Sequence, residues 1–239
     1  MSVATPYLLE APTAQRSGTL ANAIAALFLA FPVMGVFFAP EAYFAPQDFA
    51  IPTTAPSPVG DYPIGRIGFA LLLLWLILRI ARDPALFLRG VAQAAPPLLF
   101  ALYVMASALW AGDPLASFNR AGRALILALF AIDLAQHCNA RQLLRLISVA
   151  VAIAIVASII AIITPPHYGY SAIAGYHDAW RGALTHKNAF GALMSLGVVF
   201  GYYALALRAC ARPIAAFTLI ASAILLVGSR SATAIMTTL

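Results

Sequence analysis

The sequence contains few charged residues and almost no cysteine. Of its 239 residues, 9% are charged and 63% are hydrophobic, whereas soluble domains have about 25% charged and about 45–50% apolar residues. This composition excludes an ordinary water-soluble globular domain. The two cysteines, Cys138 and Cys210, are far apart in the sequence and belong to no C-x-x-C pair. We therefore expect free thiols and neither a metal site nor a haem site.

Motifs for nucleotides and metals are also missing. The sequence has no Walker motif and no dinucleotide-binding glycine motif, and its histidines do not have H-E-x-x-H spacing. We expect no cofactor and no metal. The net charge of +6 is dispersed between apolar segments and does not form a basic tail or stripe. This dispersion excludes nucleic acid as the expected partner.

Long apolar segments dominate the chain. Each has about 20 residues, which is enough for a helix to cross a hydrocarbon core of about 30 Å. They predict an all-α, polytopic membrane helix bundle embedded in the lipid bilayer, with about seven transmembrane helices and the start of an eighth after Arg230. The predicted helices are roughly 19–39, 64–80, 91–111, 120–136, 143–163, 187–207 and 213–229.

The distribution of Lys and Arg among the loops predicts the orientation. Residues 1–18 form a polar amino-terminal segment, and residues 19–239 form the transmembrane domain. Eight of the fourteen cations fall on the side of the amino terminus, so the positive-inside rule places that terminus in the cytoplasm. The eight are Arg16, Arg79, Arg82, Arg89, Arg141, Arg145, Arg208 and Arg212. The other six are Arg66, Arg120, Arg123, Arg181, Lys187 and Arg230.

The segment from Gly175 to Gly191 gathers two His, Asp, Arg, Lys and Asn in an otherwise apolar region. A helix that begins near His186 would direct its first N–H groups outward, and Lys187 would add a positive charge there. Arg181 offers a planar fork for phosphate oxygens. These residues predict a phosphate or pyrophosphate site. The alternative is a solvated loop at the membrane surface, with snorkelling cations.

Three other features invite an interpretation. Arg230 interrupts an apolar run on the same predicted face as Arg181. It is either a site residue or part of a helix terminus. Gly197 and Gly201 form a G-x-x-x-G pattern that favours close helix packing. Asp133, near a helix end, is either a proton-relay acid or, as we favour, an interfacial cap or the partner of Arg141.

Two ordered motifs carry a resemblance to a known family. W-R-G-x-x-x-H-K-N-x-x-G at 180–191 and S-R-S-A at 229–232 resemble the O-antigen ligase and Wzy-type polymerase superfamily, which has an R-G-x-x-x-x-x-N-x-x-G element and a later S-R element. The wording H-D-x-W-R-G and T-H-K-N is most similar to its ExoQ-like exopolysaccharide polymerase branch. The stretch 107–114, followed by Arg120 and Arg123, resembles the family's D-P stretch. The match covers about 95–239.

The resemblance implies a glycosyltransferase with a GT-C-like fold that needs no metal. Such a protein acts at the periplasmic side of a bacterial inner membrane and transfers glycan from undecaprenyl pyrophosphate. Arg181 and Arg230 match the motif arginines and would hold pyrophosphate. Lys187 and Asn188 would orient the donor or the helix end. Arg120 and Arg123 are weaker candidates for pyrophosphate binding.

One element of the family is missing from this sequence. Members have a downstream periplasmic loop with a histidine that is proposed to activate the acceptor hydroxyl, and this chain stops before it. We therefore expect an incomplete ligase-like domain that is inactive alone, with His177 and His186 as local candidates for the base. A chain-length regulator or other export components are further expected partners. The alternatives are a polysaccharide or lipid transporter, or a catalytically inactive membrane fragment.

Overall fold

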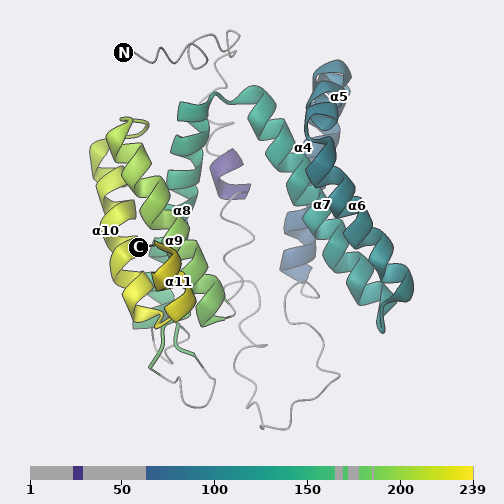
Figure 1. The fold of residues 1–239 in the computed structure, drawn as a ribbon. Coiled ribbons are helices and arrows are strands. Elements are labelled where there is room, and N and C mark those ends of the chain that lie inside the picture. Colours follow the sequence, from purple (N-terminus) through teal and green to yellow (C-terminus); the bar gives the residue numbers. More distant parts are fainter. Residues whose placement is uncertain (1–23, 29–62, 165–168, 172–177, 185, 239) are drawn as a thin grey trace, which may run out of the picture. The chain divides into compact units, whose positions relative to one another are not determined.

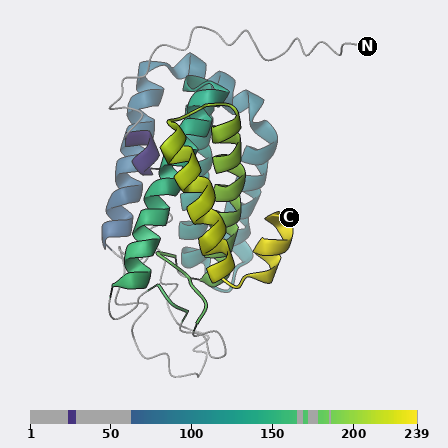
Figure 2. The same ribbon diagram turned by 90° about the vertical axis from the view of Figure 1, so that its left-hand side faces the viewer.

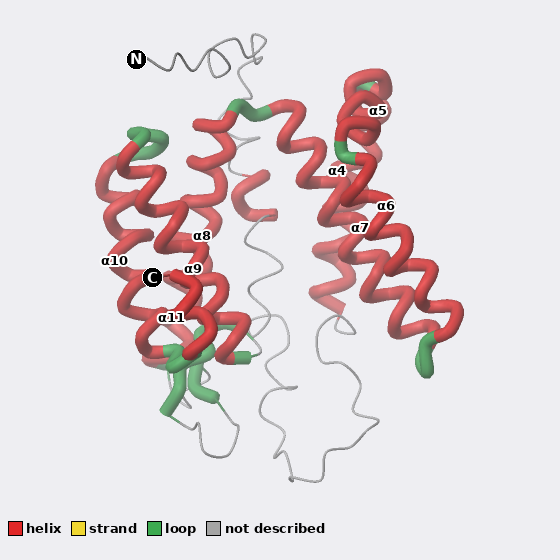
Figure 3. The backbone as a smooth tube through the Cα atoms, viewed as in Figure 1, coloured by secondary structure: helices red, strands yellow, loops and turns green. Residues whose placement is uncertain are grey.

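The computed structural model describes residues 24–28, 63–164, 169–171, 178–184 and 186–238. Within these ranges the chain is helical apart from short turns and one isolated antiparallel bridge between Tyr170 and Trp180 (Figures 1 and 3). The prediction of an all-α fold is confirmed. Residues 24–28 are helical, and the rest of the predicted helix 19–39 lies outside the described residues.

The helix boundaries follow from local sequence signals. Asp83 and Asp113 each cap a helix, because their carboxylates accept the backbone N–H of Leu86 at 2.9 Å and of Ala116 at 3.0 Å. In both cases proline follows the cap, where its missing N–H costs nothing. The helices are α4 (Pro63–Arg82), α5 (Pro84–Gln93), α6 (Ala95–Ala106), the 3₁₀ turn η2 (Ser107–Trp110), α7 (Pro114–His137), α8 (Ala140–Ile163), α9 (Lys187–Ala206), α10 (Arg212–Gly228) and α11 (Ala232–Thr238).

The predicted helix 91–111 is wrong as a single straight element. The chain breaks at Ala94, and the segments Pro84–Gln93 and Ala95–Trp110 meet at an angle of 84°. Pro96 and Pro97 lie in the first turn of α6, where a straight helix would need N–H groups that proline lacks. Hydropathy alone does not register this break, since both sides of it are apolar.

Three described helices are long and apolar enough to cross a membrane, namely α7, α8 and α9. The number rises to four if the bent pair forms one span, and α10 is a shorter apolar helix. The helices are therefore consistent with a membrane protein. The seven crossings expected from hydropathy are not confirmed by the described part of the chain.

The chain divides into two compact units. Unit 1 contains Phe69–Leu143, and unit 2 contains the described residues 24–28, 63–68 and those from Leu144 onward. In unit 1, α7 packs against α5, α6 and η2. A Cβ on Gly90 of α5 would lie 2.8 Å from Cγ of Gln136 and 2.9 Å from Cγ2 of Ile132, so the absence of a side chain allows α5 to approach α7 closely.

A buried carboxylate joins α4 to α7 within unit 1. Asp133 is 2% exposed and accepts from Nε of Arg79 at 3.2 and 3.3 Å. Nδ1 of His137, one turn further along α7, lies 3.2 Å from the same carboxylate. The predicted partner Arg141 is therefore wrong. Burying a carboxylate is costly unless it is paired and hydrogen-bonded, and Arg79 supplies that partner.

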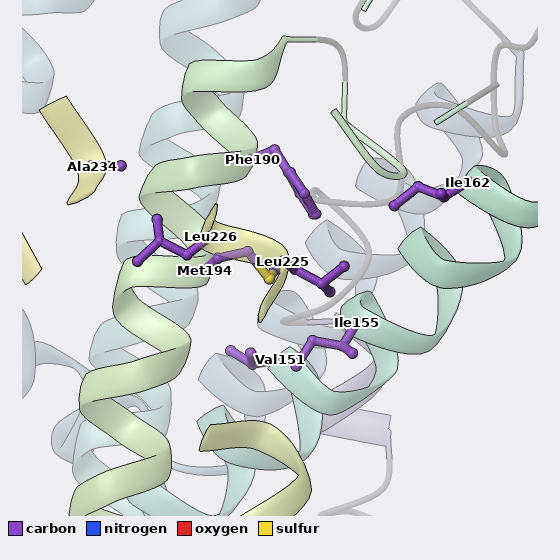
Figure 4. Packing of buried hydrophobic residues seen from close by; sticks show 8 residues of the cluster. All are labelled: Val151, Ile155, Ile162, Phe190, Met194, Leu225, Leu226 and Ala234. Atoms are coloured by element: carbon purple, nitrogen blue, oxygen red, sulfur yellow. The ribbon is translucent and has the colours of Figure 1, made fainter. Parts of the chain in front are cut away.

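The core of unit 2 lies between α8, α9, α10 and α11. Phe190 and Met194 of α9 are fully buried and lie among aliphatic side chains from the other three helices (Figure 4). The cluster consists of Val151, Ile155, Ile162, Phe190, Met194, Leu225, Leu226 and Ala234. Both cysteines are free, as expected.

The closest helix pair of unit 2 is α9 and α10, which run side by side (Figures 1 and 2). A Cβ on Gly201 would lie 2.7 Å from the backbone nitrogen of Leu219, and one on Gly197 would collide with Oγ of Ser222. The G-x-x-x-G pattern thus forms a close packing surface, as the sequence predicts.

We expect Gly201→Ala to destabilise unit 2, because the added methyl meets backbone that no rotamer change can move. Overpacking of this kind costs about 1–3 kcal/mol. Gly122→Ala in α7 is the matched control, since a Cβ there has no neighbour within 4 Å. Thermal unfolding in detergent should show a lower melting temperature for Gly201→Ala only. Equal melting temperatures would contradict the packing assigned to Gly201.

Candidate functional site

Main-chain hydrogen bonds anchor residues 178–184, here called the WRG segment, to the end of α8. The nitrogen of Gly169 donates to the carbonyl of Ala161 at 2.8 Å, and the carbonyl of Gly169 accepts from Arg181 and Gly182 at 2.7 and 3.0 Å. A helix leaves its last carbonyls without partners inside the helix. The loop therefore satisfies part of the carboxyl end of α8 and becomes fixed to it.

The same segment is bonded to the end of α10. The backbone nitrogen of Trp180 donates to the carbonyl of Gly228 at 2.9 Å. A Cβ on Gly228 would overlap the indole of Trp180, so the ring lies flat against the glycine backbone only because no side chain is present. The first motif is thus in direct contact with the residue that precedes the second motif, about 40 residues later.

A second contact joins the two motifs near the amino-terminal end of α9. A Cβ on Gly191, the last glycine of the first motif, would lie 2.7 Å from Cβ of Ser231 and 3.0 Å from Oγ of Ser229. Both serines are buried. Oγ of Ser229 donates to the carbonyl of Leu226 at 2.6 Å and accepts from the nitrogen of Ser231 at 3.3 Å. Residues 229–231, here called the SRS segment, therefore form a hydrogen-bonded turn against α9.

The turn after Trp180 requires glycine. Gly182 has φ +59°, a left-handed conformation that favours glycine. A Cβ there would lie 2.6 Å from Cε2 of Phe190 and 2.7 Å from Oγ of Ser158. Oγ of Ser158 also accepts from the nitrogen of Ala183 at 3.2 Å. This serine, in the apolar carboxyl-terminal half of α8, holds the WRG segment in place.

Arg230 is the exposed cation of the SRS segment. Its Nη1 lies 3.7 Å from Oδ2 of Asp178, and the two side chains are 63% and 82% exposed. An exposed ion pair at this distance contributes little to stability. Arg230 also has φ +48°, which is uncommon for a residue with a side chain. Because its side chain is exposed, the guanidinium is accessible to an anionic ligand that competes with Asp178.

Arg181 and Lys187 lie inside the site. They are 6% and 8% exposed, and both residues take part in interactions within the chain. Arg181 belongs to the WRG segment, and Lys187 is the first residue of α9. Two cations are thus held next to the positive amino-terminal end of a helix, where negative charge is stabilised.

His186 is the N-cap of α9. Its Nδ1 accepts from the backbone nitrogen of Asn188 at 3.1 Å, and its carbonyl accepts from Phe190 at 3.0 Å. Because Nδ1 uses its lone pair in the cap, the proton of the neutral ring is on Nε2. In this conformation His186 offers a hydrogen-bond donor, and a role as general base would require the cap to open.

Three other predicted site residues are not described as part of unit 2. His177 is outside the described residues. Arg120 and Arg123 belong to unit 1, where Arg120 is exposed and Arg123 lies 5.7 Å from the centroid of the Phe69 ring. Across the described ranges, no group of three or more His, Cys, Asp or Glu is placed to hold a metal ion.

The sequence analysis missed three supporting positions, namely Ser158, Gly169 and Gly228. Each had a signal. Ser158 is a hydroxyl within an apolar span, where it needs a partner. Gly169 and Gly228 lie just beyond and at the end of an apolar helix, where glycine often marks close backbone contact.

The fold and the site together define an all-helical protein with helices of membrane-spanning length and a cluster of cations where three helix ends meet. Comparisons with protein-family models, with curated proteins and with solved structures find no match.

We expect His186→Asn to preserve the amino-terminal turn of α9 and His186→Ala to loosen it. Asparagine is a good N-cap, whereas alanine costs about 1 kcal/mol at this position. Hydrogen exchange at the Asn188 amide measures the cap directly, and it should be faster in His186→Ala only. The cap would be wrong if both variants exchanged at the rate of the unmodified chain.

Proposed function

We propose that the chain is part of an inner-membrane glycosyltransferase of the O-antigen ligase and polymerase type, closest to the ExoQ-like branch. It would transfer or polymerise glycan from undecaprenyl pyrophosphate on the periplasmic side, in exopolysaccharide or O-antigen biosynthesis. In this proposal the chain crosses the membrane seven times from a cytoplasmic amino terminus, and the WRG and SRS segments lie at the periplasmic surface.

The contact between the two motifs supports this proposal most. The hydrogen bond from Trp180 to Gly228 and the packing of Gly191 on the SRS segment bring Arg181, Lys187 and Arg230 to one end of unit 2. Three cations at one helix junction suit a ligand with several negative charges, such as pyrophosphate. A solvated loop would not need glycine at positions 182, 191 and 228, where a Cβ would collide with packed neighbours.

The chemistry follows from the charges. Transfer breaks the bond between the anomeric carbon and a pyrophosphate oxygen, and a new bond forms to the acceptor hydroxyl, whose proton goes to a base. Negative charge develops on the leaving pyrophosphate, and Arg181, Lys187 and Arg230 would stabilise it.

His186, as the Nε2–H tautomer, would donate to the same anion, and Asn188 would hold the helix end. The acceptor's base would then come from another residue, with His177 the remaining local candidate.

The experiment uses lipid-linked oligosaccharide and membranes that contain the chain. Formation of new glycosidic bonds supports a transferase. Movement of the lipid across the bilayer without new bonds would instead identify a transporter and overturn the proposal. Binding of undecaprenyl pyrophosphate without either activity would identify a binding fragment that needs further protein to act.

We expect Arg181→Lys and Arg230→Lys to weaken undecaprenyl pyrophosphate binding and to slow any transfer by roughly ten- to hundred-fold. A charge-assisted hydrogen bond contributes about 1.5–3 kcal/mol, and lysine cannot replace the planar fork. The matched control is Arg89→Lys in α5, because Arg89 is exposed and bonds only to its own helix. Arg230 is exposed, so its variant tests the role even if Arg181→Lys folds poorly. Equal binding by all three variants would refute it.

The orientation has its own test. We expect single cysteines introduced at positions 56 and 174 to react with a membrane-impermeant thiol reagent in intact spheroplasts, and one at position 83 to be protected. Positions 56 and 174 lie in the predicted outer loops between helices 19–39 and 64–80 and between helices 143–163 and 187–207. Position 83 lies in the predicted inner loop between helices 64–80 and 91–111. Labelling of position 83 alone would place the candidate site in the cytoplasm.

A further inference from the structure

Three arginines gather at the end of unit 2 that is opposite to the candidate site. Arg208 and Arg212 flank the turn between α9 and α10. Leu144, near the start of α8, packs against that turn, and the neighbouring Arg145 lies close to Cys210 of the turn. The cluster contacted by Leu144 consists of Ala204, Ala209 and Ala215. Because α9 has 20 residues, this basic end lies about 30 Å from Lys187.

The charge of Arg145 acts on the nearby thiol of Cys210. Burial raises the pKa of Cys210, and the positive charge of Arg145 opposes that rise. An effect of this kind requires the guanidinium to lie close to the turn. Together with the packing of Leu144, it places Arg145 and the turn arginines at one surface, here called the basic end (Arg145, Arg208 and Arg212).

Among the described residues, the basic end has no acidic partner. From position 144 to 239 the sequence contains a single acidic residue, Asp178, which lies at the candidate site and contacts Arg230. Across the described ranges, none of the three arginines forms an ion pair. All three side chains are exposed. A cluster of like charges repels itself, so the arrangement is stable only beside a negative partner or in bulk water.

The conformation of Arg208 favours a partner. Its φ is +50°, in the position after a helix where glycine or asparagine is usual. The nitrogen of Ala209 donates to the carbonyl of Ala204 at 2.9 Å and completes the turn. An arginine kept where glycine would be less strained suggests that its side chain has a use.

Apolar surface adjoins the basic end. Leu207, Ile214 and Phe217 are exposed next to Arg208 and Arg212. The first turn of α10 also has no side-chain cap, so it too presents polar N–H groups toward the same end. A soluble anion would contact only the charges, whereas a phospholipid would contact the charges with its phosphate and the apolar side chains with its acyl chains.

We infer that the basic end binds the phosphate of an anionic phospholipid such as phosphatidylglycerol, with the acyl chains lying along the exposed apolar side chains of α9 and α10. This lipid site is separate from the candidate site and does not depend on the transferase proposal. It fixes the depth of unit 2 in the bilayer, since the guanidinium groups stay at the level of the phosphates.

The test titrates the detergent-solubilised full chain with phosphatidylglycerol or phosphatidylcholine of equal chain length and counts retained lipid by native mass spectrometry. We expect preferential retention of phosphatidylglycerol. Arg208→Gly should lower its affinity about five-fold, as expected for one arginine near a phosphate surface. Glycine relieves the positive φ, so this variant should fold at least as well as the unmodified chain. The double variant Arg208→Gly and Arg212→Gln should lower the affinity further.

The matched control is Arg89→Gln, which removes an exposed helical arginine from unit 1 and should leave lipid retention unchanged. Glycerol 3-phosphate, which has the headgroup charge without acyl chains, should compete only weakly. Equal retention of the two lipids, or unchanged retention by the double variant, would overturn the inference. Strong competition by glycerol 3-phosphate would also overturn it, because the site would then bind free phosphate.

Discussion

The close approach of α9 and α10 fixes the register on which the candidate site depends. Gly201 meets Leu219, Gly197 meets Ser222, and Gly191 meets Ser229 and Ser231. Gly191 lies ten residues before Gly201 along α9, and Ser229 lies ten residues after Leu219. The two antiparallel helices therefore keep one register along their contact. This register places the SRS segment beside the start of α9. Larger side chains at the glycines would separate the helices and move Arg230 away from Lys187.

Given that register, the WRG segment is positioned by the need to satisfy backbone groups. The ends of α8 and α10 leave carbonyls that no helix turn can bond, and in apolar surroundings each unpaired group is costly. The segment donates Trp180 N–H to Gly228, while Gly169 N–H bonds to Ala161. The loop that carries the cations is thus part of the hydrogen bonding of the helix ends. The candidate site is thus held by the same hydrogen bonds that complete the fold.

The sequence predicts those parts of the fold that arise from local signals. Helices at 143–163 and 187–207 are recovered closely as α8 and α9, because each is one apolar run with polar residues at both ends. Close packing at Gly197 and Gly201 is also predicted, because the G-x-x-x-G pattern is a local signal. The bend at Ala94 and the partner of Asp133 are not. The bend depends on Pro96 and Pro97 within an apolar window, and Arg79 reaches Asp133 from a helix 54 residues away. In the candidate site, the sequence identifies the cations but not the hydrogen bonds by which Ser158 and Gly228 hold the WRG segment.

The two arginines with positive φ show how the α9–α10 pair combines these constraints. Arg208 follows the end of α9, and Arg230 follows the end of α10, so each marks one end of the same helical pair. A helix of 20 residues is about 30 Å long, which matches the thickness of a bilayer's hydrocarbon core. In both places the chain uses arginine where glycine would relieve the backbone. If only chain reversal mattered, glycine would serve better at each turn. Under the two proposals above, the guanidinium at each turn supplies what glycine cannot, namely a positive charge with several donors for phosphate oxygens.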